Sequence, residues 1–528
     1  MHESLIHIPM RDGCSLAADL YRPSSDGRFP TILIQTPYGR GQFRPAMRGE
    51  DTNHGLFDRS RFAFVIVDGR GFRGLKSASQ NVTSSNLGQD GFDAVEWIAT
   101  HAWSNGLVGT WGPSALGRVQ YLTAFERPPH LRCCVPLIAA GGPPHYDEYY
   151  DNGVLRRAYM DTLAELGIPA DERVRQATTP TDPFYQTSHP FGPINHLDVP
   201  VFVITGWYDP GAARHLEMFE TIRTQAGTAA RSGSKLLVGP WHHTAVGLTR
   251  QGELLYRRAA GESDRMAKLF LEYWLCDRKD NGWDRVPTYQ WWQMGEDRWC
   301  SADRPGAVQT AEKTFYLGAD GSLSWVAPTS SIRERTFVCD PANPVPTVGG
   351  ANLSGLTGSP PAAGPCDQRA IELRDDVLVY TTEVLPASLR IYGSVNVGVK
   401  FATDKRDVNL AARLSDVYPD GRSMLIVDGI TRGKNARIIE HSPSTQAGRL
   451  AKATLRLPPT ATTIVAGHRL RVSICGSNYP RFELNPHTGE DHFNPDAALT
   501  ATCTVVHGGD CPAGIDVPTL VDRRSRQP

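Results

Sequence analysis

Short apolar runs alternate with helix-like patterns along the first 135 residues of the chain. Strands are predicted at residues 31–35, 62–67, 107–111 and 133–139, and helical spacing of apolar residues appears at 90–100 and 116–125. Strands that alternate with helices are typical of a mostly parallel sheet. The pattern therefore predicts an α/β fold.

The strand rhythm stops between about residues 141 and 198. Helical patterns at residues 152–167 and 171–176 are separated there by proline-rich turns. Strands resume at 199–205 and 235–238, and a long helical pattern follows at 263–275. A helical insertion of this kind predicts a cap over the sheet.

Beyond about residue 305 the helical patterns vanish, and short apolar runs alternate with Gly, Pro and Asp turns as far as about residue 506. This rhythm is typical of a β-sandwich or jelly roll. A chain of 528 residues also exceeds what one hydrophobic core usually organises. We predict an α/β domain in two parts, 1–140 and 199–304, a helical cap at 141–198, and a C-terminal jelly-roll β domain at 305–528.

Charge and composition exclude several classes of partner. The 55 Lys and Arg residues nearly cancel the 56 Asp and Glu residues, so no strong field attracts nucleic acid or an anionic membrane. No apolar run reaches the roughly 18 residues of a membrane span, and the N-terminus lacks the pattern of a secretory signal. The ten cysteines contain no CxxC pair. We expect a cytoplasmic protein that acts on a small molecule or short peptide. The sequence leaves open whether the protein forms a homodimer.

Candidate chemistry begins at residues 112–117 (GPSALG), which lie between a predicted strand and a predicted helix. A nucleophile elbow needs a serine on a tight strand-to-helix turn with small residues around it. Here the second glycine comes one position later than in the common form. The context makes Ser114 a candidate nucleophile.

Two later strands end on residues that complete such a site. The strand at 199–205 leads to Asp209, and the strand at 235–238 leads to His242 and His243. The separations are 95 residues (209 − 114) and 34 residues (243 − 209), in the order serine, acid, histidine that α/β-hydrolases use. We predict Ser114 as nucleophile, Asp209 as acid and His243 as base, with His242 as the rival base.

Several sequence blocks resemble the cocaine esterase-like and X-Pro dipeptidyl-peptidase family of α/β-hydrolases. The resemblance covers almost the whole chain. The blocks are 9–13 (PMRDG), 20–23 (LYRP), 36–38 (TPY), 68–71 (DGRG), 103–106 (WSNG), 206–209 (GWYD), 239–243 (GPWHH), 416–422 (DVYPDGR) and 477–482 (SNYPRF).

The resemblance implies roles for individual residues. Ser114, Asp209 and His243 match the family's triad, and Tyr38 matches a tyrosine whose hydroxyl helps to form the oxyanion hole. The Ala115 backbone N–H would be the second donor. The implied reaction is hydrolysis of a carboxylic ester or amide through an acyl-enzyme, without cofactor or metal. A packing role for Tyr38 stays open.

Two departures from the family pattern bear on the substrate. Ala115 stands where the family usually has tyrosine, and the cap at 141–198 is short for the family. We expect a wider acyl pocket and a more open site. Acyl transfer by the same triad and a catalytically inactive binding protein remain alternatives.

Other motifs are given structural interpretations. Residues 69–74 (GRGFRG) fit a dinucleotide-binding pattern, with Asp90 at the spacing of a ribose contact. The segment 75–88 that follows is polar, without the helix that would receive the phosphates, so we reject this interpretation. The pair His242–His243 has no third metal ligand at helical spacing, so no metal site is predicted.

Overall fold

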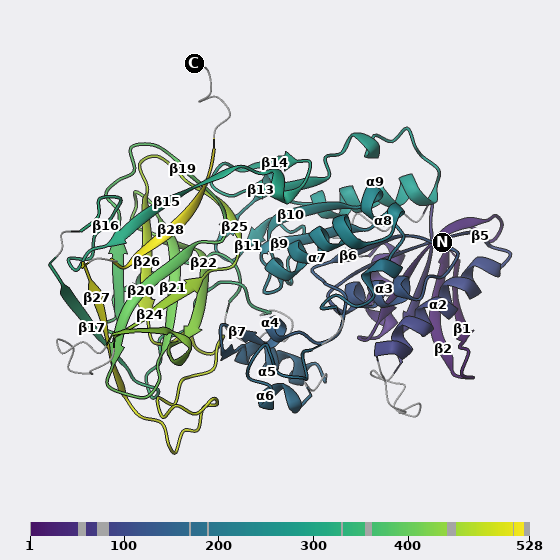
Figure 1. Ribbon diagram of the computed structural model, residues 1–528. Coiled ribbons are helices and arrows are strands. Elements are labelled where there is room, and N and C mark those ends of the chain that lie inside the picture. Colours follow the sequence, from purple (N-terminus) through teal and green to yellow (C-terminus); the bar gives the residue numbers. More distant parts are fainter. Residues whose placement is uncertain are drawn as a thin grey trace.

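The computed structural model describes residues 2–50, 60–70, 84–167, 171–186, 189–328, 331–353, 362–440, 450–509 and 512–521. An α/β unit forms one end of the molecule and a β-sandwich forms the other, with a small helical unit below the place where they meet (Figure 1). This arrangement confirms the predicted fold class.

A ten-stranded sheet organises the α/β unit, in the order β1-β2-β4-β3-β5-β6-β9-β10-β13-β14. Strands β4 to β13 in this order are parallel, and antiparallel pairs close both edges. The carboxyl ends of the parallel strands therefore lie along one edge, where α/β proteins place their sites. The strands are β1 His2–Pro9, β2 Ser15–Arg22, β3 Phe29–Thr36, β4 Ala63–Asp68, β5 Ser104–Pro113, β6 Leu131–Leu137, β9 Phe202–Tyr208, β10 Lys235–His242, β13 Tyr289–Gln293 and β14 Arg298–Ala302.

Helices cover both faces of this sheet because its strands are apolar on both sides. One hydrophobic cluster joins the sheet to α2, α3, α7 and α8, and a second cluster on the opposite face joins it to α1 and α9. The helices are α1 Arg44–Arg48, α2 Ser84–Thr100, α3 Ala115–Phe125, α7 Ala212–Gln225, α8 Thr228–Gly233 and α9 Glu262–Leu275.

The cap lies between β6 and β9 and is only partly as predicted. It contains α4 Tyr146–Tyr149, α5 Arg157–Glu165 and α6 Arg173–Gln176. The helix predicted over 152–167 is wrong in its first part, where β7 Tyr150–Asp151 and β8 Val154–Leu155 form a hairpin. Asn152 and Gly153 both have positive φ at its turn, as an Asn-Gly turn favours.

The C-terminal region is a two-sheet β domain around its own core. One sheet runs β16-β15-β28-β20-β24-β23 with β17, β19, β25 and β27 attached, and the other runs β18-β26-β21-β22. The strands are β15 Thr310–Leu317, β16 Leu323–Ser324, β17 Arg333–Cys339, β18 Val377–Thr381, β19 Leu389–Gly393, β20 Asn396–Thr403, β21 Asn409–Val417, β22 Ser423–Arg432, β23 Arg437–Glu440, β24 Leu450–Arg456, β25 Thr460–Ile464, β26 Arg469–Cys475, β27 Ala501–His507 and β28 Gly514–Leu520.

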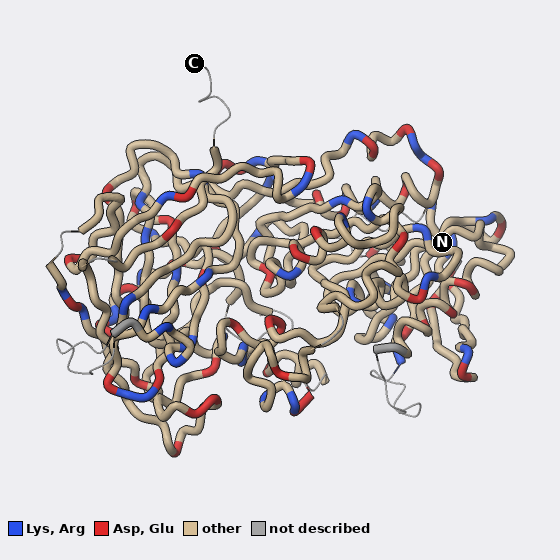
Figure 2. Tube along the Cα trace, viewed as in Figure 1, with Lys and Arg blue, Asp and Glu red and all other residues tan. Residues whose placement is uncertain are grey.

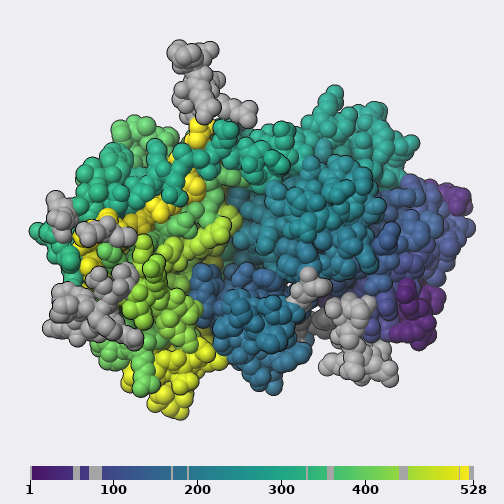
Figure 3. Space-filling view, in the orientation of Figure 1, coloured from purple at the N-terminus to yellow at the C-terminus, as the bar shows by residue number. Residues whose placement is uncertain are grey.

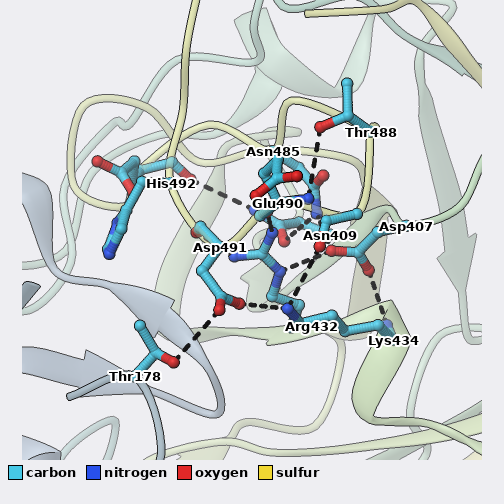
Figure 4. Close-up of polar contacts among 12 residues, drawn as sticks. Thr178, Asp407, Asn409, Arg432, Lys434, Asn485, Thr488, Glu490, Asp491 and His492 are labelled. Carbon is cyan, nitrogen blue, oxygen red and sulfur yellow. Dashed lines mark hydrogen bonds and ion pairs between the residues drawn. The ribbon is translucent and has the colours of Figure 1, made fainter. Parts of the chain in front are cut away.

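The cap contacts a polar cluster of the β domain (Figure 4). Arg432 is buried, pairs with Asp407 at 2.6 Å, and donates to backbone carbonyls of the 490–491 segment. From the cap, Thr178 donates to Asp491 at 3.4 Å. The space-filling view shows the cap at the lower side of the molecule, below the place where the two larger units meet (Figure 3).

Charged residues of both signs are interspersed over the chain (Figure 2). None of the described helices is long and apolar enough to cross a membrane. The domain bounds at 140, 198 and 304 remain predictions.

Candidate active site

Ser114 lies on a sharp turn between β5 and α3. Its backbone adopts φ 55° and ψ −120°, a conformation that a non-glycine residue adopts only under strain. A Cβ on Gly112 would lie 2.5 Å from the Leu116 Cβ, and one on Gly117 would lie 2.5 Å from the Ala139 Cβ. The two glycines therefore let the turn close, and the strained turn presents the serine at the carboxyl edge of the sheet.

Asp209 and His243 meet at the ends of neighbouring strands. His243 Nδ1 lies 2.6 Å from Asp209 Oδ2, and the two side chains are 9% and 1% exposed. Asp209 Oδ1 accepts the Gly211 N–H at 2.7 Å. By contrast, His242 Nδ1 lies 3.3 Å from Thr244 Oγ1. The geometry thus favours His243 over His242 as the partner of Asp209.

A second histidine, His215 on α7, lies on the other side of Asp209. Its Nδ1 is 2.8 Å from Thr205 Oγ1 and 3.7 Å from Asp209 Oδ1, and burial lowers its pKa to about 4. Burial alone would raise the pKa of Asp209. The interactions with His243, His215 and the Gly211 N–H have the opposite and larger effect, so the pKa of this carboxyl is lowered. Asp209 is thus held as a carboxylate, the form that accepts a proton-bearing Nδ1.

Sequence reasoning missed His215. It lies six residues beyond Asp209 (215 − 209), in a helix whose pattern alone does not reveal which strand end it covers. The structure shows how close these groups lie, since a Cβ on Gly211 would be 2.8 Å from His215 Nε2 and 3.1 Å from Asp209 Oδ1.

Tyr38 follows β3 and reaches the same edge of the sheet. Burial raises the pKa of its phenol, and a hydrogen bond with the Ser114 hydroxyl opposes that shift. The structure therefore brings Tyr38 and Ser114 together. Ser114, Ala115 and Tyr38 are only half-buried, so solvent-sized molecules can approach them.

The backbone N–H of Ala115 belongs to the first residue of α3. The first N–H groups of a helix have no intrahelical acceptor, and they carry the positive end of the helix dipole. Ser114 and His243 do not share a hydrogen bond here, since the buried Nε2 of His243 has no partner in the described part of the chain. The structure thus forms the acid–base pair and the serine–tyrosine pair separately.

The rejected dinucleotide motif lies partly outside the described residues, since 71–83 are not described. The expectation that 75–88 lacks a helix is wrong at its end, because α2 begins at Ser84. Asp90 on this helix pairs with Arg70 at 2.6 Å. Its carboxylate is therefore engaged within the protein. Among the described residues, no three His, Cys, Asp or Glu side chains gather as they would around a metal ion.

Comparison with known families covers most of the chain. The family profile described as X-Pro dipeptidyl-peptidase (S15 family) matches residues 12–177 and 169–245. The profile of the X-Pro dipeptidyl-peptidase C-terminal non-catalytic domain matches residues 281–515. The two profiles thus match the α/β part with its cap and the β domain.

Individual relatives match along the full length. The chain is 28% identical to cocaine esterase of Rhodococcus sp. (strain MB1 Bresler), with 98% of both chains covered. The structure is similar to an aminopeptidase from a marine sediment Thaumarchaeota archaeon, with a TM-score of 0.80, 20% identity, and 98% of this chain and 96% of the other covered. An α-amino acid ester hydrolase matches with a TM-score of 0.75, 21% identity and the same coverage. The chain belongs to the X-Pro dipeptidyl-peptidase and cocaine esterase family of α/β-hydrolases.

Proposed function

We propose that this hydrolase cleaves a carboxylic ester or amide of a small molecule or short peptide through an acyl-enzyme on Ser114. The observation that carries the proposal is the buried Asp209–His243 pair, 2.6 Å apart, at the same sheet edge as the strained Ser114 turn. Backbone strain and buried charged pairs are both typical of catalytic centres.

In this mechanism His243 acts as the base. Its Nδ1–H donates to Asp209, which leaves the Nε2 lone pair free to take the hydroxyl proton of Ser114 as the oxygen attacks the acyl carbonyl. The imidazolium then gives that proton to the leaving alcohol or amine. Water, activated by the same imidazole, releases the acyl group. Asp209 stabilises the imidazolium without taking the proton.

The developing oxyanion would be met by two donors. The Tyr38 hydroxyl is bonded to Ser114 before substrate arrives, and the Ala115 N–H stands at the start of α3. A neutral phenol is the form that donates. The ordinary tyrosine pKa of about 10 already keeps the phenol neutral near pH 7, and burial raises the pKa of Tyr38 further. Each such donor typically contributes about 3 kcal/mol to transition-state stabilisation.

The substrate class rests on the site's accessibility and on the family. Ser114 and Ala115 are half-buried, which leaves them accessible to water and to a substrate. The relatives carry the names of an esterase, an aminopeptidase and an ester hydrolase. Esters and amides pass through the same tetrahedral chemistry, so both classes belong to the proposal.

The test is intact mass spectrometry after exposure to a fluorophosphonate, alongside turnover of p-nitrophenyl acetate. We expect a single adduct on the wild type, none on Ser114→Ala, and strongly slowed labelling of His243→Ala. His242→Ala is the matched control and should label at close to the wild-type rate. A folded wild-type protein with neither adduct nor turnover would leave a binding protein as the remaining interpretation.

Acyl transfer is separated from hydrolysis in the same assay. Added alcohols or amines should leave the rate of acid release from the p-nitrophenyl ester unchanged if water is the acceptor. Ester or amide products that outpace the free acid would instead identify a transferase.

A further inference from the structure

Tyr38 lies in a segment that no regular secondary structure holds. β3 ends at Thr36, and the positive φ of Gly39 turns the chain before the next helical turn begins at Arg40. Thr36 Oγ1 accepts the Tyr38 N–H at 3.1 Å and the Gln42 side-chain amide at 3.0 Å. Further anchors are needed to fix where the phenol points.

Those anchors come from two neighbouring strands. Asp68 ends β4, directly opposite Thr36 in the parallel register. Its Oδ1 accepts the backbone N–H of Arg40 at 2.6 Å, and its Oδ2 pairs with the Arg40 guanidinium. One carboxylate thus binds both the backbone and the side chain of the residue two positions after Tyr38.

Asp19 on β2 is the second carboxylate that binds Arg40. It accepts from Arg40 Nε at 2.8 Å and from Arg44 Nε at 3.0 Å. The side chains of Asp19, Arg40 and Asp68 are 3%, 21% and 18% exposed, so water screens these pairs only weakly. Charge-assisted bonds of this kind are shorter and stronger than neutral ones.

We propose that Asp68 and Arg40 are positioning residues, which hold the Tyr38 hydroxyl at the oxyanion position beside Ser114. The inference rests on the proposed function of Tyr38. Asp68 holds the backbone N–H of Arg40, and Thr36 holds the backbone N–H of Tyr38. The Tyr38 ring also packs against the hydrophobic cluster that includes α1 and α9, which limits its remaining freedom.

The effect on catalysis follows from geometry. An oxyanion donor acts only at hydrogen-bond distance from the developing charge. A displacement of about 1 Å, caused by a change away from the reacting atoms, can cost about 100-fold in rate. Loss of the Asp68–Arg40 pair should therefore lower kcat and leave KM nearly unchanged, because the substrate's ground state does not need this donor.

The experiment is a double-mutant cycle on p-nitrophenyl acetate hydrolysis with Tyr38→Phe, Asp68→Asn and the double variant. Asp68→Asn alone should lower kcat about 10- to 100-fold. In the Tyr38→Phe background the same change should cost less than about 3-fold, since no hydroxyl remains to be positioned. A merely structural role would lower kcat equally in both backgrounds.

Asp93→Asn is the matched control. Asp93 also accepts a backbone N–H and the guanidinium of one arginine, Arg11, with both contacts at 2.8 Å. It belongs to α2 and not to the Tyr38 segment. We expect its kcat to stay within about 2-fold of wild type. Thermal melts of all variants identify any that fail to fold. If Asp68→Asn does not fold, Arg40→Gln replaces it, because this change removes the Asp68–Arg40 ion pair on the arginine side.

Each outcome decides one point. If Tyr38→Phe has wild-type kcat, the oxyanion role in the proposed function is wrong. If Tyr38→Phe is slow but Asp68→Asn and Arg40→Gln are not, or if the effects multiply in the double variant, the positioning role is overturned while the proposed function stands.

Discussion

Replacing Asp209 by asparagine tests the acid with almost no change in shape. Asp209 Oδ1 accepts the Gly211 N–H at 2.7 Å, and only an oxygen can take that place. The amide NH2 of the introduced asparagine would therefore occupy the position of Oδ2, which lies 2.6 Å from His243 Nδ1. The variant thus puts a donor where the wild type has an acceptor.

The magnitude follows from the tautomer that this donor selects. Nδ1 of His243 must then accept, so the ring proton moves to Nε2, and Nε2 can no longer take the Ser114 proton. A change of this kind in a serine–histidine–acid site costs on the order of 10⁴ in kcat. That loss corresponds to about 5 kcal/mol of transition-state stabilisation. KM should change little, because substrate binding does not involve Asp209.

The assay is p-nitrophenyl acetate turnover, with fluorophosphonate labelling as a second readout. Asp198→Asn is the control, since Asp198 also accepts a backbone N–H, at 2.8 Å, but precedes β9 at the opposite end of the strand. Its kcat should match wild type. An Asp209→Asn protein that keeps more than a tenth of the wild-type kcat, while Ser114→Ala is inactive, would refute the assignment of the acid.

One ring nitrogen of His492 lies against the Glu483 carboxylate and the other against the Arg175 carbonyl in the cap. The hydrogen bond to Glu483 is the main cause that raises the pKa of His492. The protonated His492 therefore stabilises the fold fully below about pH 6.5, and this stabilisation is lost as pH rises through the folded-state pKa. The melting temperature should fall over that pH range in the wild type and fall less in His492→Gln. An equal pH dependence of the two melting temperatures would contradict this role of His492. A Cβ on Gly206 would lie 2.1 Å from a backbone oxygen of β10, so Gly206→Ala should cost about 3 kcal/mol in urea unfolding, and a neutral result would show that the strands can separate. Arg432→Met should cost about 3–5 kcal/mol, because the Asp407 carboxylate would stay buried without its cationic partner; Asp407→Asn in that variant should recover part of the loss.

The candidate site residues could be singled out from the sequence because each lies where a short pattern meets a strand end. Ser114 follows an apolar run and precedes helical spacing, and Asp209 and His243 each end such a run. Parallel strands bring their carboxyl ends to one edge, so the pairing of Asp209 with His243 follows from topology. The resemblance to known hydrolases then adds Tyr38, which no periodicity distinguishes from a turn residue.

What the sequence did not reveal depends on how distant segments meet. The cluster of Asp19, Arg40 and Asp68 comes from three segments whose order in the sheet, β2-β4-β3, differs from their order in the chain. The hairpin before α5 differs, because its Asn152-Gly153 turn is a local signal in the sequence, while the helical spacing of the following residues predicts a helix over the same positions.

The β domain supports the candidate site although its family profile describes it as non-catalytic. The hydroxyl of Tyr208, the residue before Asp209, donates to the Leu425 carbonyl at 3.1 Å. In the hairpin that follows His243, the Glu253 N–H donates to the Pro365 carbonyl at 2.9 Å, and in the cap the Ala158 N–H donates to Pro480. The strand end that carries Asp209, the hairpin after His243 and the cap therefore each contact the β domain. Because misplacement by about 1 Å can cost about 100-fold in rate, a domain that contributes no reacting group can still determine whether the site works.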